Sequence, residues 1–225
     1  MITAIIFDAF GTLFQVSEGG SAKKIIHNIL ATDKEVDFEQ FTDEWKAYYK
    51  KHTASGKEFM TERDIFVSRI RMFYDRFGVC RNAREDTEAL LADAYHRKAF
   101  EEAGQVIEEL RKEYTVFIGS NTDNDVLEVV MDGNNITVDK VYTSEDLRCY
   151  KPDPEFFGKI LRENGLKAEE VMFVGDSVSD DIIGPKALGI KAVLVDRKNT
   201  MGDRGQDYTV SDLRQLHEIL KTVDK

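Results

Sequence analysis

The chain has 225 residues, 42% of them hydrophobic, so it is long enough to bury a sizeable core and too apolar to be disordered. Lysine and arginine together number 31 against 42 acidic residues, which gives a formal net charge of −11. Polyanions repel a chain this acidic, so we expect neither nucleic acid nor a membrane surface as a partner.

The cysteine content and hydropathy of the chain bear on its location. Only Cys80 and Cys149 are present, far apart, which argues against a disulfide framework and against a zinc site with four protein ligands. No stretch approaches the roughly 18–20 apolar residues of a membrane span, and the short apolar run at the N-terminus lacks the charged start of a secretion signal. We therefore expect a cytoplasmic protein.

The first predicted strand, residues 3–7, precedes a long segment of different character. Residues 17–99 carry most of the aromatic side chains, including Phe38, Phe41 and Trp45, at helical spacing and separated by charged residues. Little strand signal is present there. We expect a helical subdomain, inserted after the first strand, whose aromatic residues form its own core.

From residue 100 onward the pattern alternates between strands and helices. Short apolar runs predict buried strands at residues 115–118, 140–142, 171–174 and 191–195. Helical spacing predicts helices at residues 101–113, 125–131, 154–164 and 180–188, and a last helix capped by Ser211. This alternation is typical of an α/β fold with a parallel sheet.

Several polar residues stand where predicted strands end. Asp8 follows the first strand, Ser120 ends the second and Asp176 follows the fourth. Because the carboxyl ends of parallel strands form the ligand crevice of an open sheet, these side chains are expected to face the same crevice. Taken singly, each also has an ordinary interpretation as a turn or helix cap, and Lys151 as a surface lysine.

The turn after the fourth strand is unusually acidic, with Asp176, Asp180 and Asp181 close together. Carboxylates gathered at one strand end repel each other unless a cation compensates, and a divalent ion with oxygen ligands is the natural solution. A capping cluster on a solvated turn is the alternative, although three acids in six residues are a costly way to cap.

In this order and spacing, the motifs that begin at Asp8, Ser120, Lys151 and Asp176 resemble those of the haloacid dehalogenase-like (HAD) hydrolase superfamily. The resemblance covers essentially the whole chain. It implies a Rossmann-like core with a parallel sheet, formed by residues 1–16 and 100–225, and an all-helical cap formed by residues 17–99.

The resemblance also implies roles for individual residues. Asp8 is the expected covalent nucleophile, Thr12 and Ser120 hold the anionic small-molecule substrate, and Lys151 steadies nucleophile and intermediate. A Mg²⁺ ion is expected on Asp8, Asp176 and the main-chain carbonyl of Phe10, with Asp181 supporting it indirectly. The other residues expected to contact substrate are Ala9, Phe10, Gly11, Asn121 and Lys46.

Phe10 departs from the pattern of the phosphatases in this superfamily. Most of them carry a second aspartate two residues after the nucleophile, which protonates the leaving oxygen, and phenylalanine cannot transfer a proton. An aromatic residue there is typical of the 2-haloacid dehalogenase branch, in which halide leaves without a proton. That branch, however, carries an arginine in the cap where this chain has Lys46, and a tyrosine where it has Phe157.

Charge counting favours the phosphatase. Dehalogenases of that branch use no metal and have fewer acids in the fourth motif. In this chain the negative charges of Asp8, Asp176 and Asp181 exceed the single positive charge of Lys151. The excess negative charge predicts a divalent cation, unless salt bridges neutralise the carboxylates instead. We therefore expect a Mg²⁺-dependent phosphatase of a small phosphorylated metabolite, monomeric or homodimeric. A 2-haloacid dehalogenase and a non-catalytic phospho-ligand-binding protein remain as alternatives.

Overall fold

In the computed structural model, which describes residues 1–16 and 20–223, six strands form one parallel sheet in the order β3-β2-β1-β4-β5-β6. The chain moves outward from β1 to β3 and then returns to the other side of β1. In such a sheet the crevice at this switch point is the usual ligand site. The strands are β1 (Ala4–Phe7), β2 (Thr115–Ser120), β3 (Lys140–Thr143), β4 (Val171–Gly175), β5 (Lys191–Val195) and β6 (Tyr208–Val210).

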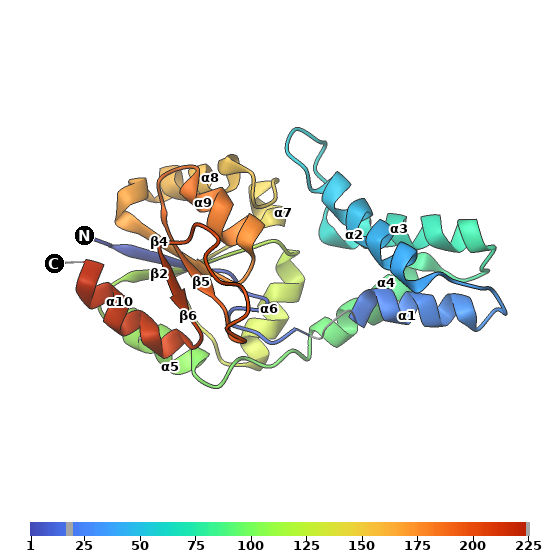
Figure 1. The fold of residues 1–225 in the computed structure, drawn as a ribbon, viewed down its shortest axis with the longest axis horizontal. Helices are drawn as coiled ribbons and strands as arrows, with labels where there is room; N and C mark the ends of the chain where they lie inside the picture. Colours follow the sequence, from blue (N-terminus) through green and yellow to red (C-terminus); the bar gives the residue numbers. More distant parts are fainter. Residues whose placement is uncertain (17–19, 224–225) are drawn as a thin grey trace.

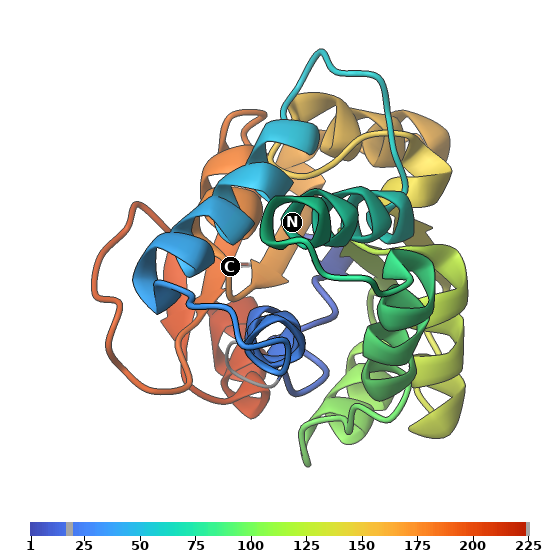
Figure 2. The same ribbon diagram turned by 90° about the vertical axis from the view of Figure 1, so that its right-hand side faces the viewer.

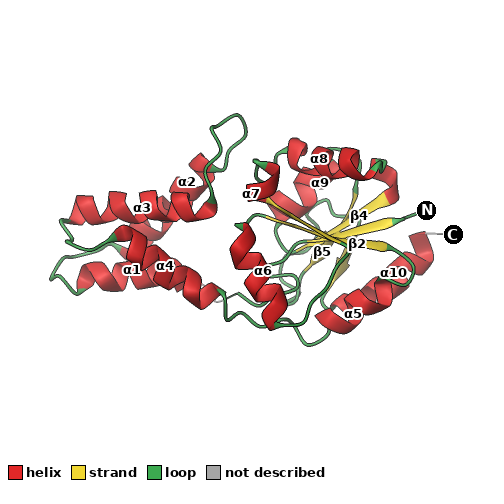
Figure 3. Ribbon diagram, turned by 180° about the vertical axis from the view of Figure 1, so that it is seen from behind, coloured by secondary structure: helices red, strands yellow, loops and turns green. Residues whose placement is uncertain are grey.

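Helices cover both faces of the sheet, which confirms the expected α/β fold with a Rossmann-like core (Figures 1 and 3). One face is covered by α5 (Ala103–Leu110), α6 (Asn124–Gly133) and α10 (Leu216–Val223). The other is covered by α7 (Ser144–Leu147), α8 (Pro154–Asn164) and α9 (Gly184–Lys186). As expected, Asp153 caps α8 ahead of Pro154. Within the described residues no helix has both the length and the apolar character needed to cross a bilayer.

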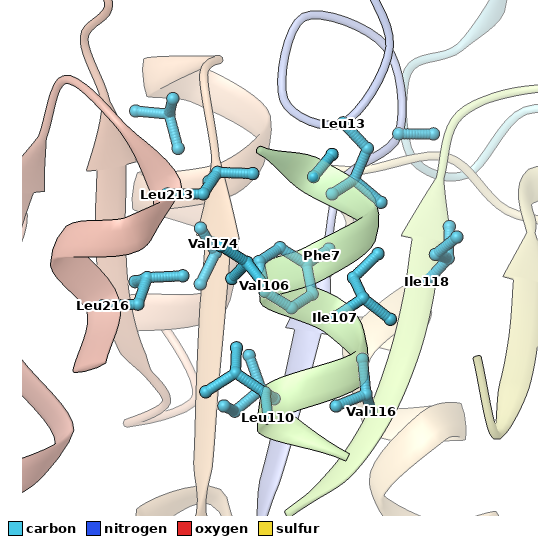
Figure 4. Close-up of a cluster of buried hydrophobic side chains, with 14 of the residues drawn as sticks. Phe7, Leu13, Val106, Ile107, Leu110, Val116, Ile118, Val174, Leu213 and Leu216 are labelled. Carbon is cyan, nitrogen blue, oxygen red and sulfur yellow. The ribbon is translucent and has the colours of Figure 1, made fainter. Parts of the chain in front are cut away.

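The pleat of the strands explains how one short apolar run serves two cores. Because successive side chains point to opposite faces, Phe7 packs beneath α5 and α10 while Ile6 packs beneath α8. Figure 4 shows the first of these clusters, in which Phe7 lies among side chains such as Val106 and Leu216. Burial on both faces fixes the carboxyl ends of the central strands.

Residues 20–94 form four helices with a core of their own, set to one side of the sheet (Figures 1 and 2). We call them the helical unit. Phe41, Trp45 and Phe73 lie at its centre, as the aromatic pattern predicts, whereas Phe38 is 51% exposed, contrary to expectation. The four helices are α1 (Gly20–Leu30), α2 (Phe38–His52), α3 (Glu62–Phe77) and α4 (Ala83–Ala94). The predicted boundary between residues 16 and 17 lies at the edge of the described residues.

Several predicted elements differ from those observed. The helix expected at residues 180–188 is a π-helix, Val178–Ile183, followed by the short α9, because Pro185 has no amide to continue an α-helix. The last helical segment is capped by Asp212 rather than Ser211, and it begins as a 3₁₀ turn, Leu213–Gln215. Strand β6 was not predicted, since it spans three residues of which only Val210 is buried. Helix α5 is shorter at both ends than the 101–113 span expected for it.

The packing of the helical unit predicts a clear mutational contrast. Phe73 is fully buried, with its ring centroid 4.1 Å from that of Phe41, so Phe73→Ala should lower the free energy of unfolding of this unit by about 3–5 kcal/mol. The exposed Phe38→Ala is the matched control and should change it by less than about 0.5 kcal/mol. Trp45, the single tryptophan, lies in the same cluster, so its fluorescence during urea unfolding measures both effects. Equal effects of the two substitutions would contradict this packing.

Candidate active site

Three carboxylates meet at the switch point of the sheet. Asp8 directly follows β1, Asp176 directly follows β4, and Asp181 lies in the π-helix that begins two residues later. One oxygen atom from each lies within 4.8 Å of the others, so all three fit around one small cation. Residues far apart in the sequence converge here because β1 and β4 are neighbours with matched ends.

Two glycines allow the carboxylates to come so close. A Cβ atom at Gly11, whose φ is +96°, would lie 2.3 Å from the Oδ2 atom of Asp176. A Cβ atom at Gly175 would lie 2.3 Å from the Cγ atom of Asp181. Any other residue at either position would displace a carboxylate from the cluster.

Among the described residues, Lys151 is the only lysine whose ammonium group forms salt bridges with the carboxylate cluster. Its Nζ atom lies 2.7 Å from Oδ1 of Asp8 and 2.7 Å from Oδ1 of Asp181, and the residue is 3% exposed. The Asn121 side chain holds the Lys151 main chain in place: it accepts the Lys151 amide at 2.8 Å and donates to the Lys151 carbonyl at 3.0 Å. Salt bridges therefore do form, but they engage two carboxylates of the three.

The electrostatics of the cluster follow from this imbalance. Burial, reinforced by the charge of Asp8, raises the pKa of Asp176 to about 6. Burial also raises the pKa of Asp181, although Lys151 opposes the rise. Burial would lower the pKa of Lys151, but the charges of Asp181 and Asp8 outweigh it and raise that pKa above its usual value. The cluster thus resists holding all three carboxylates ionised without a further cation.

The comparisons with known proteins agree with this geometry. The family model for haloacid dehalogenase-like hydrolases matches residues 2–189. The chain belongs to this family. The expected resemblance is thereby confirmed, and the protein is a HAD-like hydrolase.

Relatives of this hydrolase include enzymes of both chemistries. A glyceraldehyde 3-phosphate phosphatase of Methanocaldococcus jannaschii is 41% identical over 90 residues, which span 39% of this chain and 40% of the phosphatase. An (S)-2-haloacid dehalogenase of a Pseudomonas species is 27% identical over 97% of this chain and 96% of its own length. A ribulose-1,5-bisphosphate 5-phosphatase of Halopiger xanaduensis is likewise 27% identical, over 98% of this chain and 100% of its own length. Relatives that match nearly the whole chain therefore include both phosphatases and dehalogenases.

Solved structures show the same fold. A HAD hydrolase of Bacillus subtilis bound to magnesium superimposes with a TM-score of 0.76, at 16% identity and coverage of 98% of this chain and 99% of that one. The L-2-haloacid dehalogenase of Xanthobacter autotrophicus gives a TM-score of 0.71, at 19% identity and the same coverage. At these identities the likeness concerns the fold alone.

The two hydroxyl groups expected to hold the substrate anion, Thr12 and Ser120, each bond to a carboxylate of the cluster. Ser120 Oγ donates to Oδ1 of Asp8 at 3.2 Å. Thr12, expected beside the substrate anion, is fully buried, and its Oγ1 donates to Oδ1 of Asp176 at 3.3 Å. Thr12 therefore orients Asp176 in this structure. Both oxygens of Asp181 are also engaged, by Lys151 and by the amide of Ser177.

Not every expected site residue lies in the cluster. Ala9, expected to contact substrate, is fully buried in one hydrophobic core. Phe157, at the position of the dehalogenase tyrosine, is fully buried in the other. Lys46 is exposed on the helical unit and lines a separate large cavity of about 720 Å³ between that unit and the sheet. Phe10 and Asn121 line both this cavity and the carboxylate site, so the two spaces adjoin.

Contacts that the motifs did not reveal join the helical unit to the site. Asp123 stands at the start of α6, yet its side chain accepts the amides of Glu62 and Arg63 from the start of α3, at 2.7 and 2.8 Å. Arg63 also pairs with Asp125 at 2.7 Å. A polar triplet directly after the Ser120 loop was the only sequence signal for this contact, and it does not identify the partner.

The raised pKa of Asp176 predicts how stability depends on pH. Because its pKa is raised, the Asp176 carboxyl contributes stability to the metal-free fold that is fully present below its ordinary pKa of 3.8 and is lost as the pH rises through about 6. In Asp176→Asn the amide oxygen still accepts from Thr12, so this variant should gain about 1–2 kcal/mol over the wild type between about pH 5 and pH 8. Urea unfolding in chelator measures this. Asp75→Asn, on the exposed side of α3, is the control. A difference in the free energy of unfolding between Asp176→Asn and the wild type that does not change with pH would contradict the raised pKa of Asp176.

Proposed function

We propose that this hydrolase is a Mg²⁺-dependent phosphatase of a small phosphorylated metabolite and that it works through a covalent intermediate on Asp8. The observation that supports this best is the cluster of three carboxylates within 4.8 Å, compensated by a single lysine. Two negative charges remain in excess. A substrate phosphate brings further negative charge, which the site could not accept without a divalent cation.

The donor set suits Mg²⁺. Asp8, Asp176 and the main-chain carbonyl of Phe10 would hold the ion through oxygen atoms, the ligands that it prefers. Because both oxygens of Asp181 are engaged by protein donors, this residue would support the site through its neighbours. When bound, the ion would neutralise charge on the phosphoryl group and help to orient it.

The residues of the chain supply the remaining chemistry. Ser120 and Lys151 both donate to Oδ1 of Asp8, which fixes the carboxylate so that its other oxygen can attack phosphorus. The bond between phosphorus and the leaving oxygen breaks as the aspartyl phosphate forms, and water then releases the phosphate. Lys151 stays protonated throughout and stabilises the added negative charge.

Phe10 limits the range of substrates, because its ring cannot protonate the leaving oxygen. Esters whose leaving group is stable without a proton should therefore be the best substrates. The Phe10 side chain is half-buried and lines both the carboxylate site and the large cavity, so the position is open to a leaving group from either side.

A 2-haloacid dehalogenase is the second candidate. Phe10 favours it, since halide leaves without a proton. Relatives that match nearly the whole chain include a dehalogenase and a phosphatase at the same identity, so they do not decide between the candidates. In that reaction Asp8 attacks carbon, and water hydrolyses the resulting ester. The excess charge of the carboxylate cluster is the feature that this candidate leaves unexplained.

Product release separates the two candidates. With Mg²⁺, the wild type should release phosphate from p-nitrophenyl phosphate, and both a chelator and Asp8→Asn should reduce turnover by at least about 10³-fold. Asp75→Asn should leave it unchanged. Ion chromatography of the same preparations with 2-chloropropionate detects chloride. Chloride release in chelator, without phosphate release from any ester, would establish the dehalogenase instead.

Substitution of Phe10 tests the missing proton donor. Phe10→Asp should raise kcat/KM for alkyl phosphates relative to p-nitrophenyl phosphate by about 10²-fold, because only the alkyl leaving group needs the proton. Asparagine has the same shape as aspartate but cannot act as an acid, so Phe10→Asn should leave this ratio of kcat/KM values unchanged. If both variants shift the ratio equally, the effect comes from space in the site, and the proton-donor explanation is wrong.

A further inference from the structure

Arg97 lies beside the carboxylate site without belonging to any of its motifs. It follows α4 in the segment that returns from the helical unit to the sheet, and its guanidinium carbon lies 4.5 Å from the ring centroid of Phe10. Asn134, at the end of α6, fixes this segment by donating to the Arg97 carbonyl at 2.9 Å and accepting the Ala99 amide at 2.8 Å. The guanidinium is therefore held over Phe10 by the rigid part of the fold.

The Arg97 guanidinium has no hydrogen-bond acceptor or ion-pair partner among the residues that the structure describes. Other half-buried arginines do have one: Arg63 pairs with Asp125, and Arg197 pairs with Glu102. Burial lowers the pKa of Arg97, and the charge of Glu62 offsets this only in part. The Oε1 atom of Glu62 accepts the Tyr49 hydroxyl at 3.1 Å. Arg97 thus carries a partly desolvated charge that Glu62 and the Phe10 ring compensate only in part, and no described residue accepts a hydrogen bond from it.

The surroundings of Arg97 are basic, although the chain as a whole carries −11. Arg97 lines the large cavity together with Lys46 and Lys98, and Lys24, which also lines it, already pairs with Asp93. Glu62 lines the cavity as well, so its basic residues outnumber its acidic ones without being alone there. A volume of about 720 Å³ is within the range of sites for small ligands. Through Phe10 and Asn121 the cavity adjoins the carboxylate cluster, so one small molecule can reach both.

We propose that Arg97, assisted by Lys46, binds a second anionic group of the substrate. The substrates would then be phosphate monoesters that carry a carboxylate or a second phosphate several bonds away from the ester that is cleaved. This inference rests on the proposed phosphatase function and adds the substrate class. A guanidinium forms two parallel hydrogen bonds with either kind of anion, which supplies the acceptors that Arg97 lacks.

Matched pairs of esters test the subsite through phosphate release. For the carboxylate we compare 3-phosphoglycerate with glycerol 3-phosphate, and for the second phosphate fructose 1,6-bisphosphate with fructose 6-phosphate. In the wild type, kcat/KM should be at least about 10-fold higher for the doubly anionic member of one pair. The pair that shows this preference identifies the second anion as a carboxylate or a phosphate. Arg97→Gln should lower that ratio by about 10- to 100-fold, mainly through KM. Arg84→Gln, on the exposed side of α4, should leave the ratio unchanged.

Binding of non-hydrolysable analogues separates this inference from the phosphatase proposal. Calorimetry with 4-phosphonobutyrate and butylphosphonate compares the same chain with and without a carboxylate. The wild type should bind 4-phosphonobutyrate at least about 10-fold more tightly, and Arg97→Gln should abolish the difference. Absence of phosphate release from every ester would overturn the phosphatase proposal, and calorimetry would then decide the subsite alone. Equal kcat/KM ratios or equal affinities in the wild type and Arg97→Gln would overturn the subsite and leave Arg97 with only its packing against the Phe10 ring.

Discussion

The repulsion between three crowded carboxylates, two of them buried and one half-buried, is the constraint around which this molecule is arranged. Asp8 and Asp176 meet because β1 and β4 are adjacent, and both strands are anchored by side chains buried on two faces. Lys151 supplies one compensating charge, and Asn121 fixes its main chain. The fold thus provides the free energy that keeps like charges together, and function depends on what a ligand or ion gains by relieving their repulsion.

Much of this arrangement could be predicted from the sequence because it depends on short stretches of neighbouring residues. Asp8 and Asp176 could be placed since each follows a buried apolar run, and parallel strands end at the same edge. The π-helix could not be predicted, because it depends on Pro185 and on side-chain bonds to Ser177 and Asp181 that form only after folding. The role of Thr12 was missed for the same reason, since its partner Asp176 lies 164 residues away.

Arg97 shows the limit of motif analysis most clearly. In the sequence it is one of many charged residues after a helix, with no spacing that connects it to Asp8. Its position depends on Asn134, 37 residues later, and on the ring of Phe10. Phe10 itself was recognised as a departure from the phosphatase pattern, but only the structure shows that its ring lies between the carboxylate cluster and a basic cavity.

The contact between Asp123 and the start of α3 has a mechanical consequence. Asp123 is 2% exposed and accepts two amides that no turn of α3 can satisfy, so it fastens the helical unit directly to the loop that carries Ser120. Hydrogen bonds to a charged acceptor contribute about 1.5–3 kcal/mol each, so these two bonds are a substantial part of what holds the start of α3 against the sheet. Since both partners stand at helix starts, the two bonds also set the alignment of α3 with α6, and with it the dimensions of the cavity between the helical unit and the sheet.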